Sequence, residues 1–125
     1  MVKEILFVGA GGALGSVLRY GTGQLIDTYF PGRFPLATLG INIFGCFIIG
    51  VLMAYFLEQQ QAHHARLFLI TGFCGGYTTF SAFAAENLDL IQQGQLISAM
   101  FYIFLSVIVG IAAVWAGLFA FRLMG

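Results

Sequence analysis

The sequence has 125 residues, of which 60% are hydrophobic and only 8% are charged, and its mean hydropathy is +0.95. Soluble domains carry roughly 25% charged residues, so this composition excludes an ordinary soluble domain and indicates an integral membrane protein. Five basic residues balance five acidic ones, which leaves no basic surface that would hold a nucleic acid.

Four charge-poor runs predict four membrane-spanning helices. They cover residues 5–26, 36–57, 67–85 (running on to about 90) and 96–121. Each has about the 17–25 residues that a helix needs to cross roughly 30 Å of hydrocarbon. The start resembles a signal peptide but lacks a clear cleavage site, so we expect a retained span. Short connections predict one membrane domain over residues 1–125.

The first predicted span contains a charge and a small-residue motif. Arg19 lies about two-thirds of the way along it, and either lines an anion vestibule or pairs with a lipid headgroup or with Asp27. Gly11 and Gly15 form a G-x-x-x-G pair, which packs helices closely either between chains or within one. A dinucleotide-binding loop is excluded, because Leu14 stands where G-x-G-x-x-G requires glycine.

The second predicted span contains a lone amide, Asn42, with Thr38 one turn before it. Polar side chains at that depth usually face another helix or a pore. Two interpretations of Asn42 stay open: it hydrogen-bonds to a neighbouring helix, or it faces a pore.

The third predicted span combines glycines with hydroxyls, in the order Gly72, Gly75, Gly76, Thr78, Thr79. The Gly-Gly pair costs about 2 kcal/mol of helix propensity relative to alanine, so we expect a helix break there, near the bilayer midplane. Freed main-chain groups must be buried in protein or line an ion site. A kink satisfied by neighbouring helices is the alternative.

Two phenylalanines follow the expected break. Phe80 and Phe83 are three residues apart, on one helix face, and the positive edges of their rings can attract a partly dehydrated anion. Thr79 and Ser81 add hydroxyl donors. Ordinary core packing is the alternative for the two rings.

The fourth predicted span places three hydroxyls along one stripe, those of Ser98, Tyr102 and Ser106. Such a stripe suits a polar pore wall, although each hydroxyl can also bond to a carbonyl of its own helix. Glu86, at the end of the third span, is expected to be a solvated or helix-paired carboxylate.

The basic residues give a weak orientation signal. With four spans, both termini and the second connection share one side, which collects Lys3, Arg66 and Arg122, while Arg33, with Arg19 if it reaches outward, lies on the other. Insertion in both orientations is therefore feasible and would supply an antiparallel dimer. A chain this small has little room to surround an aqueous path alone, so we expect it to oligomerise.

Three segments together resemble the Fluc (CrcB) family of fluoride channels. They are GGALGSVLRY (11–20), TLGINIFG (38–45) and GFCGGYTTFS (72–81), the last followed by Phe83 and Glu86. The resemblance covers essentially the whole chain, and the third motif is the most specific. One departure is Ala82, where the family usually has threonine, so a hydroxyl is lost there.

The resemblance implies a channel and not an enzyme. It implies passive export of fluoride from the bacterial cytoplasm by an antiparallel, dual-topology homodimer in the inner membrane, with two parallel pores along the subunit interface. The implied site residues are the pore rings Phe80 and Phe83, the pore amide Asn42, the vestibule cation Arg19, and the main-chain oxygens of Gly75 and Thr78, which from both subunits would hold a structural Na⁺ on the dimer axis.

Two other functions stay open. A small dimeric proton-coupled exporter of lipophilic cations would need a carboxylate deep in a span, and the only candidate, Glu86, lies near an end. A non-transporting assembly subunit would leave the clustered polar groups of the third span without a purpose.

Overall fold

The computed structural model describes residues 1–125 and contains helices but no strand. The elements are α1 (Val2–Tyr29), α2 (Leu36–Glu58), α3 (His63–Arg66), η1 (Leu67–Cys74), α4 (Gly75–Tyr77), α5 (Phe80–Gln92) and α6 (Leu96–Met124). The predicted all-α fold with four long helical passages is confirmed, and α3, η1, α4 and α5 together form the third passage. The stretch η1 is π-helical, which the sequence did not predict.

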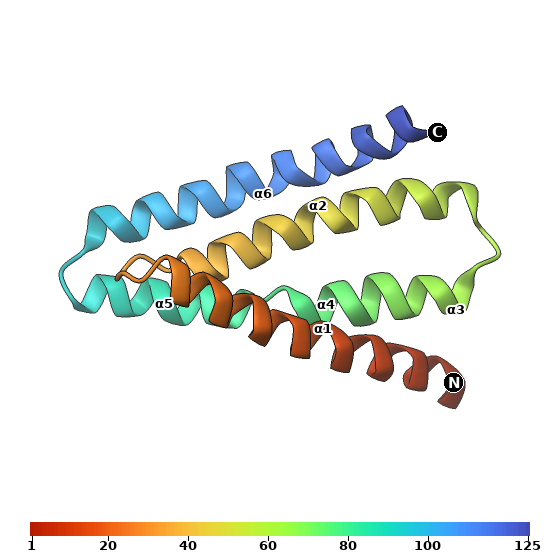
Figure 1. Cartoon of the computed structure of the whole chain (residues 1–125), viewed down its shortest axis with the longest axis horizontal. Helices are drawn as coiled ribbons and strands as arrows, with labels where there is room; N and C mark the ends of the chain where they lie inside the picture. The colour runs from red at the N-terminus through yellow and green to blue at the C-terminus, as the bar shows by residue number, and fades with distance from the viewer.

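The chain runs back and forth between two ends of an elongated bundle. Both termini and the connection from α2 to α3 lie at one end, while the α1–α2 and α5–α6 connections lie at the other (Figure 1). This is the arrangement predicted from an even number of spans. Within the bundle, α2 packs mainly on α6, and α1 packs mainly on η1 and α4.

Three helical stretches are long and apolar enough to cross a membrane: Leu36–Glu58, His63–Gln92 and Leu96–Met124. The 28 residues of α1 also have the necessary length, but its composition is more polar, so the first predicted span stays a prediction. Large apolar side chains remain exposed over much of the surface, including Phe101, Phe104 and Trp115 of α6. Such a surface must be covered by lipid or by another chain.

Glycines allow two helix pairs to approach until main chain meets main chain. A Cβ atom on Gly15 would overlap the carbonyl oxygen of Phe73, and one on Gly76 would fall 2.5 Å from that of Gly12. Gly50 of α2 lies in the same way against the carbonyl of Val114 in α6. The G-x-x-x-G pair of α1 therefore packs helices within one chain.

The third passage is broken at its centre, as predicted, but not at the expected residues. Gly75 and Gly76 are helical, whereas Thr78 (φ −85°, ψ 158°) and Thr79 (φ −148°, ψ 120°) are extended. Close packing of Gly76 on α1 keeps the glycine pair helical despite its low propensity. The break falls at Thr79 because its hydroxyl caps α5, accepting a hydrogen bond from Ala82 N at 3.2 Å.

Candidate functional site: a helix break between two cavities

Asn42 of α2 pairs with the main chain at the break. Its Nδ2 donates to Thr79 O at 2.9 Å, and its Oδ1 accepts from Thr79 N at 2.8 Å. Thr79 N, which would bond to Gly75 O in an unbroken helix, is thus bonded by the amide instead. Asn42 holds two helices together, the first of its two interpretations, and it also borders a cavity, described below.

Arg19 of α1 lies at the other side of the break. Its Nε donates to Gly76 O at 3.1 Å, so the cation sits at the carbonyl end of the short helix α4, where the helix dipole favours positive charge. The side chain is half-buried, and neither predicted partner, a headgroup or Asp27, accounts for this bond. Arg19 also lines a polar cavity.

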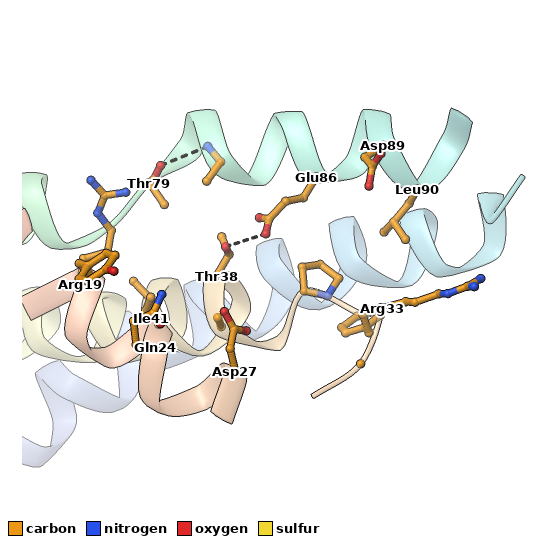
Figure 2. A pocket seen from close by; sticks show the side chains of 17 residues that line it. Arg19, Gln24, Asp27, Arg33, Thr38, Ile41, Thr79, Glu86, Asp89 and Leu90 are labelled. Carbon is orange, nitrogen blue, oxygen red and sulfur yellow. Dashed lines mark hydrogen bonds between the residues drawn. The ribbon is translucent and has the colours of Figure 1, made fainter. Parts of the chain in front are cut away.

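The polar cavity has a volume of about 400 Å³ and lies between α1, α2 and α5 (Figure 2). Its charged and hydrogen-bonding side chains are those of Arg19, Tyr20, Gln24, Asp27, Arg33, Thr38, Thr79, Glu86 and Asp89. Side chains from the α1–α2 connection complete its wall. The cavity therefore reaches from the helix break toward one end of the bundle.

Glu86 is not the plain solvated or helix-paired carboxylate that its sequence position predicted. It is half-buried, and both of its oxygens accept hydrogen bonds from other helices, Oε2 from Thr38 Oγ1 at 3.0 Å and Oε1 from Tyr102 OH at 3.1 Å. Thr38 and Tyr102 are themselves buried. The prediction failed because the partners come from α2 and α6, which sequence spacing along α5 cannot reveal.

Replacing Tyr102 by phenylalanine should lower the free energy of unfolding by roughly 1.5–3 kcal/mol, the usual worth of a hydrogen bond to a charged group. The ring should stay in place, because it packs edge-on against Phe34 and Phe83 with centroids 5.6 and 5.0 Å apart. Denaturant unfolding in detergent measures the change. Tyr55→Phe is the matched control, since that hydroxyl is exposed and makes no hydrogen bond; an equal loss in both variants would contradict the prediction.

A second, largely apolar cavity of about 490 Å³ lies on the opposite side of the break. It brings together seven of the predicted site residues, namely Asn42, Gly75, Thr78, Thr79, Phe80, Phe83 and Ser106. Three others lie elsewhere: Tyr102 is buried beside Glu86, Arg19 lines the polar cavity, and Ser81 is exposed next to Thr79. Thr79 borders both cavities, so they meet at the break.

The three hydroxyls of the predicted stripe on α6 have different surroundings. Ser98 contacts the side chain of Gln95 at 3.4 Å, and Tyr102 binds Glu86. The Oγ atom of Ser106 is buried without a hydrogen-bond partner beside the apolar cavity. Of the three, only Ser106 keeps a free donor on that side of the break.

The two phenylalanines after the break form a tilted pair, with ring centroids 5.7 Å apart and planes at 45°. Phe80 is 78% exposed, and Phe83 is partly buried against Tyr102. Core packing therefore accounts for much of the position of Phe83 and for very little of that of Phe80.

The carbonyl oxygens of Gly75 and Thr78 lose the donors that a continuous helix would give them. The helical partner of Gly75 O is Thr79 N, which donates to Asn42, and that of Thr78 O is Ala82 N, which donates to the Thr79 hydroxyl. Gly75 is exposed, and the space beside its Cα is open. Both carbonyls thus come from the segment that borders the apolar cavity.

The sequence matches the family described as CrcB-like protein, Camphor Resistance (CrcB), over residues 6–118. The chain belongs to this family. It is 50% identical over 119 residues to the fluoride-specific ion channel FluC of Flavobacterium psychrophilum, a match that covers 94% of this chain and 95% of that protein. The FluC protein of Rhizobium meliloti is 46% identical over 124 residues, covering 98% and 99% of the two chains. The CrcB family groups ion channels and not enzymes, so no residue of the break needs a catalytic role.

Proposed function

We propose that this protein is a fluoride-specific ion channel that lets fluoride leave the cytoplasm passively. The observation that carries the proposal is the central break at Thr78 and Thr79, with a cavity on either side and Thr79 common to both. A helix gives up its own hydrogen bonds inside a membrane only where other groups or ions use them. The choice of fluoride comes from the names of the relatives, which match nearly the whole chain.

The residues at the break offer a dehydrated anion several groups with a partial positive charge. None of the groups that would contact the anion there carries a full positive charge. Phe80 and Phe83 supply ring edges, and Ser106 supplies an unused hydroxyl. Asn42 still has one amide hydrogen after bonding Thr79 O. Arg19 lies on the polar side, where its charge favours entry of an anion. Weak binding at several sites is what conduction requires.

The proposal includes an antiparallel homodimer with two pores along its interface. It is supported by the exposed apolar surface and by a cavity that one chain leaves open beside Gly75 and Phe80. The weak charge bias between the two ends, with three basic residues against one or two, supports dual topology. The protein would then be a multi-pass protein of the bacterial inner membrane.

A structural Na⁺ on the dimer axis fits the residues present. Main-chain carbonyls are hard oxygen ligands, and those of Gly75 and Thr78 lack their helical donors. Two copies of the chain would together supply four such oxygens. The ion would neutralise dipoles that otherwise point at one another across the interface.

Purified protein in lipid vesicles loaded with potassium fluoride tests the proposal. With valinomycin to carry the counter-current, fluoride should appear outside rapidly, whereas vesicles loaded with potassium chloride should release almost none. An ion-selective electrode measures both rates. Absence of fluoride release in vesicles that contain folded protein would contradict the proposal.

A proton-coupled exporter of lipophilic cations remains the second candidate, because the half-buried Glu86 is bonded to α2 and α6 and lines the polar cavity. Such a transporter would carry a lipophilic cation into the vesicles in exchange for protons that move out down their gradient. Uptake that depends on the gradient, without fluoride release, would favour this candidate.

A further inference from the structure

The outer part of the polar cavity carries three charged residues from three segments. They are Asp27 of α1, Arg33 of the α1–α2 connection and Asp89 of α5, and all three are exposed. None of them forms an ion pair, since the only ion pair in the chain joins the Met1 ammonium to Glu4. Their charges therefore act on whatever enters the cavity.

All three residues line the cavity, but their side chains point in different directions. In Figure 2, Asp27 and Asp89 point inward from α1 and α5, and Arg33 extends away from them. Asp89 is also held in place, because its Oδ2 accepts from Gln93 Nε2 at 3.0 Å. An anion that enters from the outer end of the cavity passes both carboxylates before it reaches Arg19.

Simple electrostatics gives the size of the effect. A unit charge about 8 Å away in water changes the local concentration of a monovalent anion by roughly twofold when screening is weak. The effect extends over a Debye length, about 30 Å at 0.01 M salt and about 3 Å at 1 M. Charges that line a cleft bounded by protein act more strongly than isolated surface charges.

We propose that Asp27 and Asp89 limit the rate at which fluoride enters the polar cavity, and so set the flux of the channel. This inference rests on the proposed function. The two residues act from a distance through their charge, without binding the ion. Flux through the wild-type protein should therefore be lowest, relative to a neutral variant, when the salt concentration is low.

The test compares fluoride release from vesicles by the wild-type protein, Asp27→Asn, Asp89→Asn and the double variant. In about 10 mM salt, each single change should raise the initial rate roughly two- to threefold, and the double change by about the product. In about 1 M potassium glutamate, the rates should converge. A rise that persists unchanged at high salt would show a structural effect and overturn the inference.

Two matched variants separate charge in the cavity from other causes. Asp89→Glu keeps the carboxylate and should keep the wild-type rate. Glu58→Gln removes one negative charge at the end of α2, outside the cavity, and should leave the rate unchanged. Unaltered rates in both aspartate variants at low salt, or an equal rise in Glu58→Gln, would overturn the inference while the channel function stands. A wild-type protein that releases no fluoride would instead refute the proposed function, and this inference with it.

Discussion

Replacing Asn42 by leucine is expected to cost the protein its helix break and with it both stability and fluoride release. Leucine has the same branched side-chain skeleton, but it leaves Thr79 N without a partner in an apolar region and removes the second donor from Thr79 O, which as the N-cap carbonyl of α5 keeps its helical bond. One unsatisfied buried group costs about 1–3 kcal/mol, so the free energy of unfolding should fall by roughly that amount. Denaturant unfolding in detergent measures the loss, and the vesicle assay should show little fluoride release.

Asn87→Leu is the matched control for this prediction. Asn87 is also a buried amide of the third passage, yet its Nδ2 bonds only to Phe83 O of its own helix, at 2.9 Å, and its Oδ1 has no partner. Its replacement should therefore cost no more than about 1 kcal/mol. If Asn42→Leu were as stable as Asn87→Leu and conducted fluoride normally, the bracing role of Asn42 would be wrong.

Replacing Phe80 by isoleucine is expected to reduce fluoride release at least about tenfold while the protein stays folded. Phe80 is 78% exposed, so isoleucine fits without strain, but it has no positive ring edge for the anion. A loss of about 1.4 kcal/mol at the highest barrier corresponds to a tenfold fall in rate. Phe83→Ile should act in the same direction, with an added cost in stability because Phe83 packs on Tyr102.

The control for this prediction is Phe101→Ile. Phe101 is exposed on α6 and lines neither cavity, so fluoride release should match that of the wild type. The elution volume in gel filtration shows whether each variant keeps its assembly. Normal release by both Phe80→Ile and Phe83→Ile would exclude the aromatic mechanism and leave the fold unaffected.

The sequence predicted that the third passage is broken, but it misplaced the break by three residues. Gly75 and Gly76 do have low helix propensity, but the break that this predicted at the glycine pair is absent. Propensity is a weak preference that packing overrides. Gly76 is helical since its missing side chain lets α1 approach. The capping hydroxyl of Thr79 was visible in the sequence and would have located the break.

The roles of Arg19, Asn42 and Glu86 show what single-chain patterns leave open. Each is a polar residue in an apolar run, which is enough to predict that it has a partner. The partners, Gly76 O, the main chain of Thr79, and the hydroxyls of Thr38 and Tyr102, lie 16 to 57 residues away along the chain. No helical or extended spacing connects such positions, so only the packed fold identifies them.

The break has a consequence for how the protein is made. The extended residues of the third passage depend on Asn42 of α2, and the end of α4 depends on Arg19 of α1. Chains are synthesised from the N-terminus, so Arg19 and Asn42 have left the ribosome before the third passage, whose backbone they bond. A reordered gene that encoded the third passage first would deliver to the translocon a segment with unsatisfied backbone and nothing yet present to complete it.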